Sequence, residues 1–302
     1  MWDRMRDERW VAIAAVVVVM VVFGTTFVAI KIALTEMGPF TLAFARFLIA
    51  LVPFLPFLLR KDAGVRTWQL GAMGFLGVTL FFSLQNWALV YTTAANAAII
   101  LSAIPALTAV LGHLLLGESL EPARGLGILL SMAGVGVVVI GGPPGTAEIE
   151  VAGGRALLGN LLVLGAAASW ALYTVLGRRV VGRLSPAAST AHTMAWGVLF
   201  LTPFALGEMV VAGVSWPTLE GWAALLFLAL IASGVAFFLY LFALTRMEAG
   251  EASLYVNLSP VVSLAAAHLI LAEPITGLQL LGTGLVLLGV YLTERAGRRL
   301  NS

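Results

Sequence analysis

The sequence contains no cysteine and few charged residues, and both absences narrow the classes of protein to which it can belong. Without cysteine the chain can form neither a disulfide framework nor a thiolate metal site. Charged residues make up 11% of the 302 residues, whereas hydrophobic residues make up 61%. A soluble domain carries about 25% charged residues, so this composition is typical of a membrane protein.

Carboxylates are absent from the middle of every long apolar run. Aspartate occurs only at Asp3, Asp7 and Asp62, and the glutamates lie at the ends of the runs or between them. A proton-coupled pump of organic cations generally needs a buried acid that alternates between proton and substrate. The sequence therefore argues against that mechanism and leaves facilitated diffusion open.

The patterns of common catalytic and cofactor sites are also missing. The sequence shows no His/Glu metal cluster and no Ser-His-Asp arrangement, and no GKS/T motif follows the glycines of "GAMGFLG" (Gly71–Gly77). Although the pI is 9.2, the net charge is only +2, and the basic residues are scattered over short connections. We therefore expect no enzymatic activity, no metal or cofactor, and no nucleic-acid partner.

Ten apolar runs are present that can cross a bilayer, whose hydrocarbon core of about 30 Å requires about 20 helical residues. We expect spans at 10–34, 39–59, 68–90, 94–116, 122–140, 156–176, 186–211, 219–244, 250–271 and 275–293. The first run is too long for a signal peptide and lacks a cleavage site, so we expect it to stay in the protein. The sequence thus predicts an all-α integral membrane protein with ten transmembrane helices, in contact with the lipid bilayer, and leaves its oligomeric state open.

The lysines and arginines predict how these spans are oriented, because basic residues accumulate in cytoplasmic loops. With a cytoplasmic N-terminus, 14 of the 17 basic residues fall on the cytoplasmic side: Arg4, Arg6, Arg9, Arg60, Lys61, Arg66, Arg124, Arg178, Arg179, Arg183, Arg246, Arg295, Arg298 and Arg299. Only Arg155 falls in an outer loop, while Lys31 and Arg46 lie within spans. We therefore expect both termini in the cytoplasm.

Two stretches of the chain repeat each other. "SAIPALTAVLGHLLLGE" (Ser102–Glu118) recurs as "NLSPVVSLAAAHLILAE" (Asn257–Glu273). The matched pairs are Pro105/Pro260, His113/His268, Glu118/Glu273, Gly127/Gly282 and Gly134/Gly289 at one offset, and Pro39/Pro186 and Pro56/Pro203 at a slightly shorter one. Because five spans is an odd number, a second copy must enter the membrane from the opposite side. We predict two inverted five-helix repeats, 1–140 and 156–302, joined by a Gly- and Pro-rich periplasmic linker at 141–155.

The repeated prolines, Pro105 and Pro260, interrupt the fourth and ninth spans. Each lacks an N–H, so the carbonyl four residues earlier loses its helical partner. Such a carbonyl is tolerated at membrane depth only beside another helix, a polar side chain or a water-filled cavity. A packing kink is the alternative for either proline alone. Their equivalent positions in two inverted halves predict hinges beside a binding site at the midplane.

Polar and aromatic side chains at helical spacing are candidates for a substrate path, because such groups avoid lipid. The candidates are Thr25, Thr79, Phe82, Ser83, Asn86, Ser102, Trp170, Tyr173, Tyr240, Tyr255, Asn257 and Ser259. Hydroxyl, amide and aromatic groups suit a zwitterionic or amphipathic solute. The alternative is that the hydroxyls bond their own backbone or join neighbouring helices.

Ionisable residues in the spans have several interpretations. Arg46 could hold a substrate carboxylate, pair with backbone carbonyls or extend to the interface, and we favour a structural role. Lys31 is expected to extend to the outer interface. For His113 and His268 we favour interfacial packing over a proton relay.

Four segments carry the pattern of a known family: "FGTTFVAIK" (Phe23–Lys31), "FARFLIA" (Phe44–Ala50), Tyr91–Glu118 and Glu251–Pro274, the last two each followed by a Gly-rich span. Together they resemble the drug/metabolite transporter superfamily in its ten-span EamA-type branch, over nearly the whole chain. The resemblance implies a central cavity lined by spans 1, 3, 4, 6, 8 and 9, with spans 5 and 10 at the periphery.

The same resemblance implies a function, because bacterial relatives include exporters of amino acids, aromatic ones among them. We expect export of amino acids or similar small amphipathic metabolites across the bacterial inner membrane by alternating access. Efflux of organic cations or drugs is the alternative, and a non-transporting membrane scaffold is a less favoured one.

Overall fold

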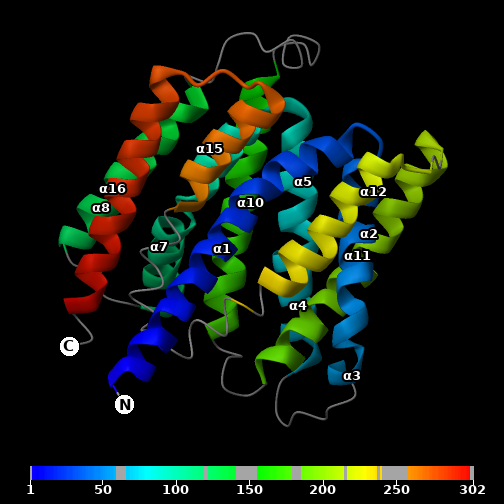
Figure 1. The fold of residues 1–302 in the computed structure, drawn as a ribbon, viewed down its shortest axis with the longest axis horizontal. Coiled ribbons are helices and arrows are strands. Elements are labelled where there is room, and N and C mark those ends of the chain that lie inside the picture. The colour runs from blue at the N-terminus through cyan, green and yellow to red at the C-terminus, as the bar shows by residue number, and fades with distance from the viewer. Residues whose placement is uncertain are drawn as a thin grey trace.

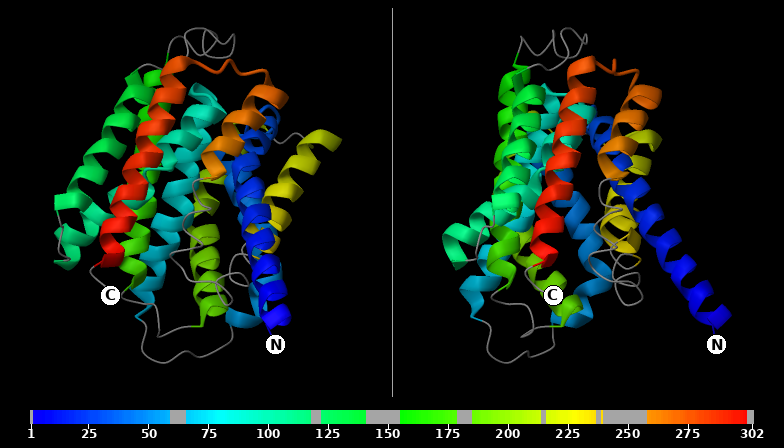
Figure 2. Two further views of the ribbon diagram at one scale, coloured as in Figure 1. Left: turned by 60° about the vertical axis from the view of Figure 1, so that its left-hand side comes forward. Right: turned by 90° about the vertical axis from the view of Figure 1, so that its left-hand side faces the viewer.

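The structure is a computed structural model that describes residues 2–58, 66–117, 122–140, 155–178, 185–213, 216–236, 239 and 258–299. All regular elements within these ranges are helices, which pack side by side in one bundle (Figure 1). The two ends of the chain lie at the same end of the bundle, as all views show (Figure 2). The expected all-α fold is thus confirmed for the described residues.

Six helices are long and apolar enough to cross a membrane: Trp10–Leu34, Pro39–Leu58, Thr67–Tyr91, Ala94–Leu116, Ala156–Gly177 and Ala187–Ala212. They match expected spans 1 to 4, 6 and 7. Four shorter apolar helices, Gly125–Val139, Leu219–Val235, Leu258–Leu271 and Gly277–Leu292, fall within or close to expected spans 5, 8, 9 and 10. Parts of span 8, at 237–238 and 240–244, and of span 9, at 250–257, lie outside the described residues.

The N-terminal part of the bundle has a continuous first helix and several interrupted ones. Its elements are α1 (Trp2–Leu34), α2 (Pro39–Leu51), η1 (Val52–Phe54), α3 (Leu55–Leu58), α4 (Thr67–Gly74), η2 (Phe75–Leu80), α5 (Phe81–Tyr91), α6 (Ala94–Leu101), α7 (Ile104–Leu116) and α8 (Pro122–Ile140). The helix of span 4 ends at Leu101 and resumes at Ile104, with Pro105 in the first turn of α7. The interruption expected from Pro105 is therefore present.

The C-terminal part has elements of comparable length. They are α10 (Ala156–Arg178), α11 (Pro186–Ala212), α12 (Leu219–Leu226), η3 (Phe227–Val235), α15 (Leu258–Leu271) and α16 (Gly277–Arg299). Pro203 lies inside α11 without ending it. Pro260 is buried near the start of α15, and the residues just before this helix are outside the described part.

Two of the spans contain a π-helical stretch. The π-helix η2 continues α4, and the π-helix η3 continues α12 in the same way. In each, a hydroxyl bonds a carbonyl five residues earlier: Thr79 Oγ1 donates to Gly74 O at 3.5 Å, and Ser233 Oγ donates to Leu228 O at 3.0 Å. Such stretches are rare and frequently mark functional sites.

Helices α8 and α16 lie side by side at the periphery of the bundle (Figures 1 and 2). Glycines allow their backbones to approach closely: a Cβ built on Gly134 would lie 2.7 Å from Gly282 O, and one on Gly289 would lie 2.5 Å from Gly127 O. Small residues at a helix interface permit this packing in a membrane. The glycine-rich faces of spans 5 and 10 are therefore close-packing surfaces.

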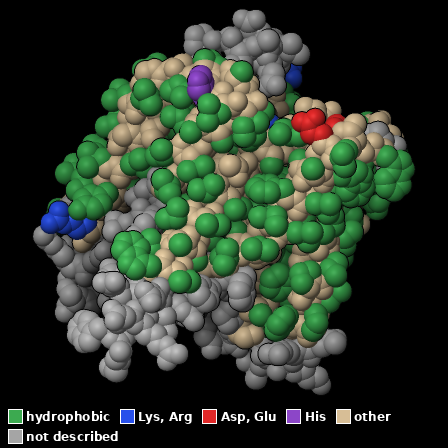
Figure 3. Space-filling model, viewed as in Figure 1, with side chains coloured by type: hydrophobic (Ala, Val, Ile, Leu, Met, Phe, Trp, Pro, Cys, Tyr) green, Lys and Arg blue, Asp and Glu red, His purple; other side chains and the backbone are tan. Residues whose placement is uncertain are grey.

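The outer surface of the bundle is hydrophobic, and the charged groups visible on one face lie toward its two ends (Figure 3). Large apolar side chains such as Leu129, Leu199 and Val210 are more than half exposed. An exposed apolar surface of this extent is typical of a protein surrounded by lipid.

Candidate functional site

A cavity of about 450 Å³ lies among the helices. Its lining comes from α1, α2, η2, α5, α6, α10, α11, η3 and α15: Met20, Phe23, Thr26, Phe27, Arg46, Phe47, Gly77, Val78, Phe81, Phe82, Gln85, Leu101, Trp170, Tyr173, Thr190, Thr193, Met194, Ala232, Ser233 and Ser259. This volume suits a small organic molecule. Both π-helices contribute to the wall, η2 through Gly77 and Val78 and η3 through Ala232 and Ser233.

Aromatic rings form a continuous row along the cavity. We call it the aromatic row, and its members in order are Tyr173, Trp170, Phe81, Phe82 and Phe47. Successive ring centroids are 5.1, 4.8, 4.7 and 4.6 Å apart, and the rings are tilted or edge-on to one another. Such pairs are favourable arrangements of aromatic quadrupoles. The row offers an apolar or aromatic ligand an extended contact surface.

Arg46 of α2 stands at the Phe47 end of the aromatic row. Its guanidinium carbon lies 4.7 Å from the Phe82 ring centroid and 5.5 Å from that of Phe47, so it makes cation–π contacts with both. Its Nε donates to Ser233 Oγ at 3.0 Å. The residue is 7% exposed, and no carboxylate pairs with it in the described part of the chain.

Gln85 of α5 adds an acceptor to the cavity wall. Its side chain is buried, and its Oε1 has no hydrogen-bond partner among the described residues. A buried amide oxygen without a partner costs free energy unless a ligand or water supplies a donor. The lining of the cavity therefore combines a cation, a buried amide and an aromatic wall.

Four of the residues predicted from sequence line this cavity: Phe82, Trp170, Tyr173 and Ser259. Three others, Tyr240, Tyr255 and Asn257, lie outside the described residues. The structure thus brings together predicted residues from spans 3, 6 and 9.

The remaining predicted residues do not line the cavity, and most bond to backbone instead. Thr25 Oγ1 donates to Val22 O at 2.9 Å, and Ser102 Oγ donates to Ile99 O at 2.6 Å, each within its own helix or just past its end. Thr79 joins η2 to α11 by donating to Gly197 O at 3.2 Å.

Asn86 and Ser83 of α5 also lie away from the cavity lining. Asn86 Nδ2 donates to Pro39 O at 3.0 Å and so ties α5 to the start of α2. Ser83 Oγ is buried without a partner among the described residues. The Asn86 contact is an interhelical bond of the kind typical of membrane bundles.

Several lining residues were not among the predicted site residues, and many of them come from spans 2 and 7. Arg46 and Phe47 belong to α2, while Thr190, Thr193 and Met194 belong to α11. For Arg46 a signal was present, since an intramembrane charge marks a functional position by default. The residues of α11 have no comparable signal in the sequence.

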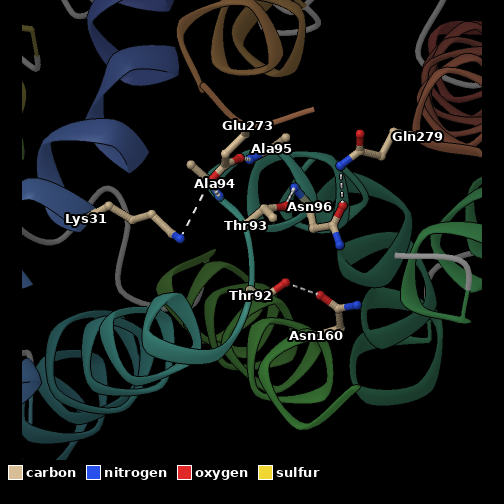
Figure 4. A network of polar contacts seen from close by, with 9 residues as sticks. All are labelled: Lys31, Thr92, Thr93, Ala94, Ala95, Asn96, Asn160, Glu273 and Gln279. Carbon is tan, nitrogen blue, oxygen red and sulfur yellow. Dashed lines mark hydrogen bonds and ion pairs between the residues drawn. The ribbon is translucent and has the colours of Figure 1, made fainter. Parts of the chain in front are cut away.

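A second polar centre lies around Glu273, just after α15 (Figure 4). The Glu273 carboxylate accepts from the backbone N–H groups of Ala94 at 2.9 Å and Ala95 at 3.2 Å, at the start of α6. Lys31 Nζ lies 3.5 Å from Glu273 Oε1, and the two side chains are 10% and 6% exposed. The expectation that Lys31 extends to the interface is wrong, because its ammonium turns inward to this buried carboxylate.

Further buried polar contacts surround the Glu273 centre (Figure 4). Gln279 Nε2 donates to Asn96 Oδ1 at 2.7 Å, and Thr92 Oγ1 donates to Asn160 Oδ1 at 2.5 Å. His268 Nδ1, on α15 itself, lies 2.9 Å from the backbone oxygen of Glu273. These contacts join α6 to α16 and the connection between α5 and α6 to α10.

Two other glutamates make similar contacts at helix starts. Glu208 of α11 accepts from the N–H and hydroxyl of Thr41, both at 2.7 Å, in the first turn of α2. Glu36, which follows α1, accepts from the N–H and hydroxyl of Thr218, the N-cap of α12. A carboxylate at a helix N-terminus is stabilised by the helix dipole and by free N–H groups. We call Glu36, Glu208 and Glu273 the glutamate clasp.

The clasp lies at the end of the bundle away from the two chain termini. Its helices show this directly, because Glu36 follows the last residue of α1 while the N-terminus of α1 is at the other end (Figure 1). Each clasp residue joins an element before residue 141 to one after residue 155: Glu273 to α6, Glu208 to α2, and Glu36 to Thr218.

Comparison with known proteins agrees with this architecture. An uncharacterized transporter of Archaeoglobus fulgidus is 33% identical over 279 residues, covering 91% of this chain and 94% of that protein. A "Probable amino-acid metabolite efflux pump" of Escherichia coli K12 is 30% identical over 289 residues, covering 91% of each. A solved structure that is 21% identical covers 98% of this chain and 99% of its own with a TM-score of 0.63, which shows a shared fold.

The model of the EamA-like transporter family matches residues 10–140 and 157–295. The match covers most of the chain, and relatives aligned over nearly their whole length are named as transporters or efflux pumps. These names point to a membrane transporter rather than an enzyme. On these grounds the chain belongs to the EamA-like transporter family.

Proposed function

We propose that this protein exports amino acids or similar small amphipathic metabolites across a bacterial inner membrane. The observation that carries the proposal is the cavity, whose volume of about 450 Å³ is lined by the aromatic row, the cation of Arg46 and the amide of Gln85. These groups complement an apolar side chain, a carboxylate and an ammonium respectively. Relatives named as probable amino-acid metabolite efflux pumps support the substrate class.

Ten spans in two inverted five-helix repeats are part of the proposal. The glycine contacts between α8 and α16 support it: Gly134 approaches Gly282, and Gly289 approaches Gly127. Gly282 is the repeat counterpart of Gly127, and Gly289 is that of Gly134. Replacing each glycine by its counterpart therefore converts one of the two contacts into the other. Residue numbers rise along α8 as they fall along α16, so the helices are antiparallel, which an inverted repeat requires.

The proposed topology places the linker at 141–155 in the periplasm and the C-terminus in the cytoplasm. In a variant with a single cysteine at Ala147, a membrane-impermeant maleimide added outside spheroplasts should react; with the cysteine at Ser302 it should react only after permeabilisation. The native chain has no cysteine, so no background labelling arises. The reverse pattern would contradict the proposed orientation, and equal labelling at both positions would contradict the separation of linker and C-terminus.

Alternating access is the proposed mechanism, in which the two repeats rock around the cavity. The glutamate clasp supports it, because all three contacts join the halves at one end of the bundle and would hold that end closed. With cytoplasmic termini, that end faces the periplasm. The interruption at residues 102–103 and the proline Pro260 near the start of α15 supply hinge positions beside the cavity.

Transport by proteoliposomes tests the function itself. Labelled amino acids should be released from vesicles containing the protein, and Trp170→Ala should lower the affinity for aromatic amino acids about tenfold, because it removes the ring that joins Tyr173 to Phe81 in the aromatic row. Trp68→Ala is the matched control, since Trp68 is 61% exposed and outside the cavity. Equal flux in wild-type and empty vesicles would reject the proposal in favour of a scaffold.

Efflux of organic cations is the rival that the same vesicles test. Among the described residues that line the cavity there is no carboxylate, and Arg46 would repel a cation. A cation pump would move charged dyes in a pH-dependent manner and leave amino acids untouched. That result would replace the proposed substrate class.

A further inference from the structure

Arg46 is a buried cation for which the described part of the chain supplies no anion. Its Nε is bonded to Ser233 Oγ, and the faces of Phe47 and Phe82 lie beside it. No carboxylate or carbonyl bonded to its Nη groups appears in that part. The Nη donors of the guanidinium are therefore available to a ligand in the cavity that Arg46 lines.

An isolated charge at this depth is costly, because the membrane interior and the protein core both solvate charge poorly. Such a charge persists where it pairs, faces water or serves a site. The existing contacts orient the guanidinium without neutralising it, since a hydroxyl and two aromatic rings carry no net charge. A ligand carboxylate would supply the missing negative charge and accept two parallel hydrogen bonds in the fork geometry of arginine.

The charge of Arg46 lies next to an extended apolar surface. The guanidinium lies at one end of the aromatic row, within cation–π distance of Phe82, and the row continues through Phe81 to Trp170 and Tyr173. A ligand held by its carboxylate at Arg46 can therefore lay an apolar body along these rings.

We infer that Arg46 is the carboxylate-binding residue of the cavity, and that the protein selects organic acids with an aromatic or apolar body. Ser233 positions the guanidinium through its bond to Nε. The carboxylate is the required group, whereas an α-ammonium adds a contact to Gln85 without being essential. The inference rests on the proposed function for its site, but it is tested by binding to the purified protein.

A ligand series separates the charged groups. 3-Phenylpropionate carries the carboxylate alone, L-phenylalaninol carries the ammonium alone, and L-phenylalanine carries both. Calorimetric titration of the detergent-solubilised wild type should show binding of both carboxylates and at least tenfold weaker binding of the alcohol. Weaker binding of the carboxylates than of phenylalaninol, equal binding of all three, or no binding of either carboxylate would overturn the inference.

Variants then assign the selectivity to one residue. Arg46→Gln should weaken binding of 3-phenylpropionate about ten- to a hundredfold and abolish the preference over phenylalaninol. Arg46→Lys should retain part of the affinity, because the charge remains while the fork geometry is lost. Arg155→Gln, at an exposed arginine away from the cavity, is the control and should bind as the wild type does.

Failure of this inference is distinguishable from failure of the proposed function. Flux of phenylalanine and phenylalaninol at equal rates would retain transport and reject carboxylate selection. Carboxylate-selective binding lost in Arg46→Gln, without flux of any solute, would retain the binding site and reject transport. Should Arg46→Gln not fold, the ligand series on the wild type and the Arg46→Lys variant decide the matter by themselves.

Discussion

Substitution of Gly134 by leucine is expected to destabilise the folded protein by about 3 kcal/mol, a value at the upper end of typical overpacking costs. A Cβ at this position would lie 2.7 Å from Gly282 O and 2.8 Å from Val286 N, both backbone atoms of α16. Backbone atoms cannot turn away as a flexible side chain can, so α8 and α16 must separate. The measurement is unfolding in mixed micelles followed by circular dichroism as the SDS fraction rises.

The same helix supplies the control for this prediction. A Cβ on Gly136 would meet nothing within 4 Å, so Gly136→Leu adds the same apolar volume without displacing α16. It should unfold at nearly the same SDS fraction as the wild type. Gly134→Ala should fall between the two, since its single methyl already overlaps Gly282 O. Equal stability of Gly134→Leu and Gly136→Leu would show that the close contact of α8 and α16 does not contribute.

Hydropathy predicted the helical class and the positions of the apolar helices, because a membrane imposes a narrow range of lengths on a spanning helix. The agreement is closest where no polar interruption occurs, as in α8, whose bounds of Pro122–Ile140 match the expected span. The sequence could not predict the π-helices η2 and η3, since a π-helical stretch leaves the apolar character of a span unchanged. The sequence did indicate the break at Pro105, because proline lacks the backbone N–H whatever surrounds it in the fold.

The candidate site was harder to predict, for a physical reason that α5 illustrates. Its polar stripe at Ser83 and Asn86 avoids lipid by facing other helices, whereas its cavity face carries Phe81, Phe82 and Gln85. The spacing of polar residues distinguishes the lipid-facing side of a helix from its protein-facing side. It does not distinguish a side packed against another helix from a side that lines a cavity. The sequence predicted only part of the aromatic row for the same reason. Nothing in the sequence distinguishes Phe81 from a phenylalanine that faces lipid.

Contacts between segments that are distant in the chain could not be predicted from the sequence. Lys31 and Glu273 lie near opposite ends of the chain, and each by itself reads as an interfacial residue. Their pairing follows from the packing of α1 against α15, which also brings the start of α6 to the same point. The repeated His and Glu after the prolines marked the segment as special but gave no partner for the carboxylate.

Neutralising the glutamate clasp at Glu273 should open the end of the cavity that faces away from the chain termini. The Glu273 carboxylate accepts two N–H groups at the start of α6 and pairs with Lys31. Hydrogen bonds to a charged group contribute about 1.5–3 kcal/mol each, and the helix dipole of α6 adds to them. Glu273→Gln keeps the shape but removes the charge, so the closed state should lose about tenfold or more in population.

Cysteine labelling measures that population. Leu101 lines the cavity and is 8% exposed, so a cysteine at this position reports access to the cavity. A membrane-impermeant maleimide applied from the periplasmic side should label it about ten times faster in the Glu273→Gln background. Labelling from the cytoplasmic side should slow, because the two open states compete in alternating access.

Two further variants separate the clasp from a general loosening of the fold. Glu220→Gln removes an exposed carboxylate in the first turn of α12, at the same end of the bundle, and should leave labelling unchanged. Lys31→Met removes the ion pair but leaves both N–H contacts of Glu273, so it should accelerate periplasmic labelling less than Glu273→Gln does. Faster labelling from both sides in Glu273→Gln would indicate local unfolding, and unchanged labelling would show that Glu273 does not hold the cavity closed.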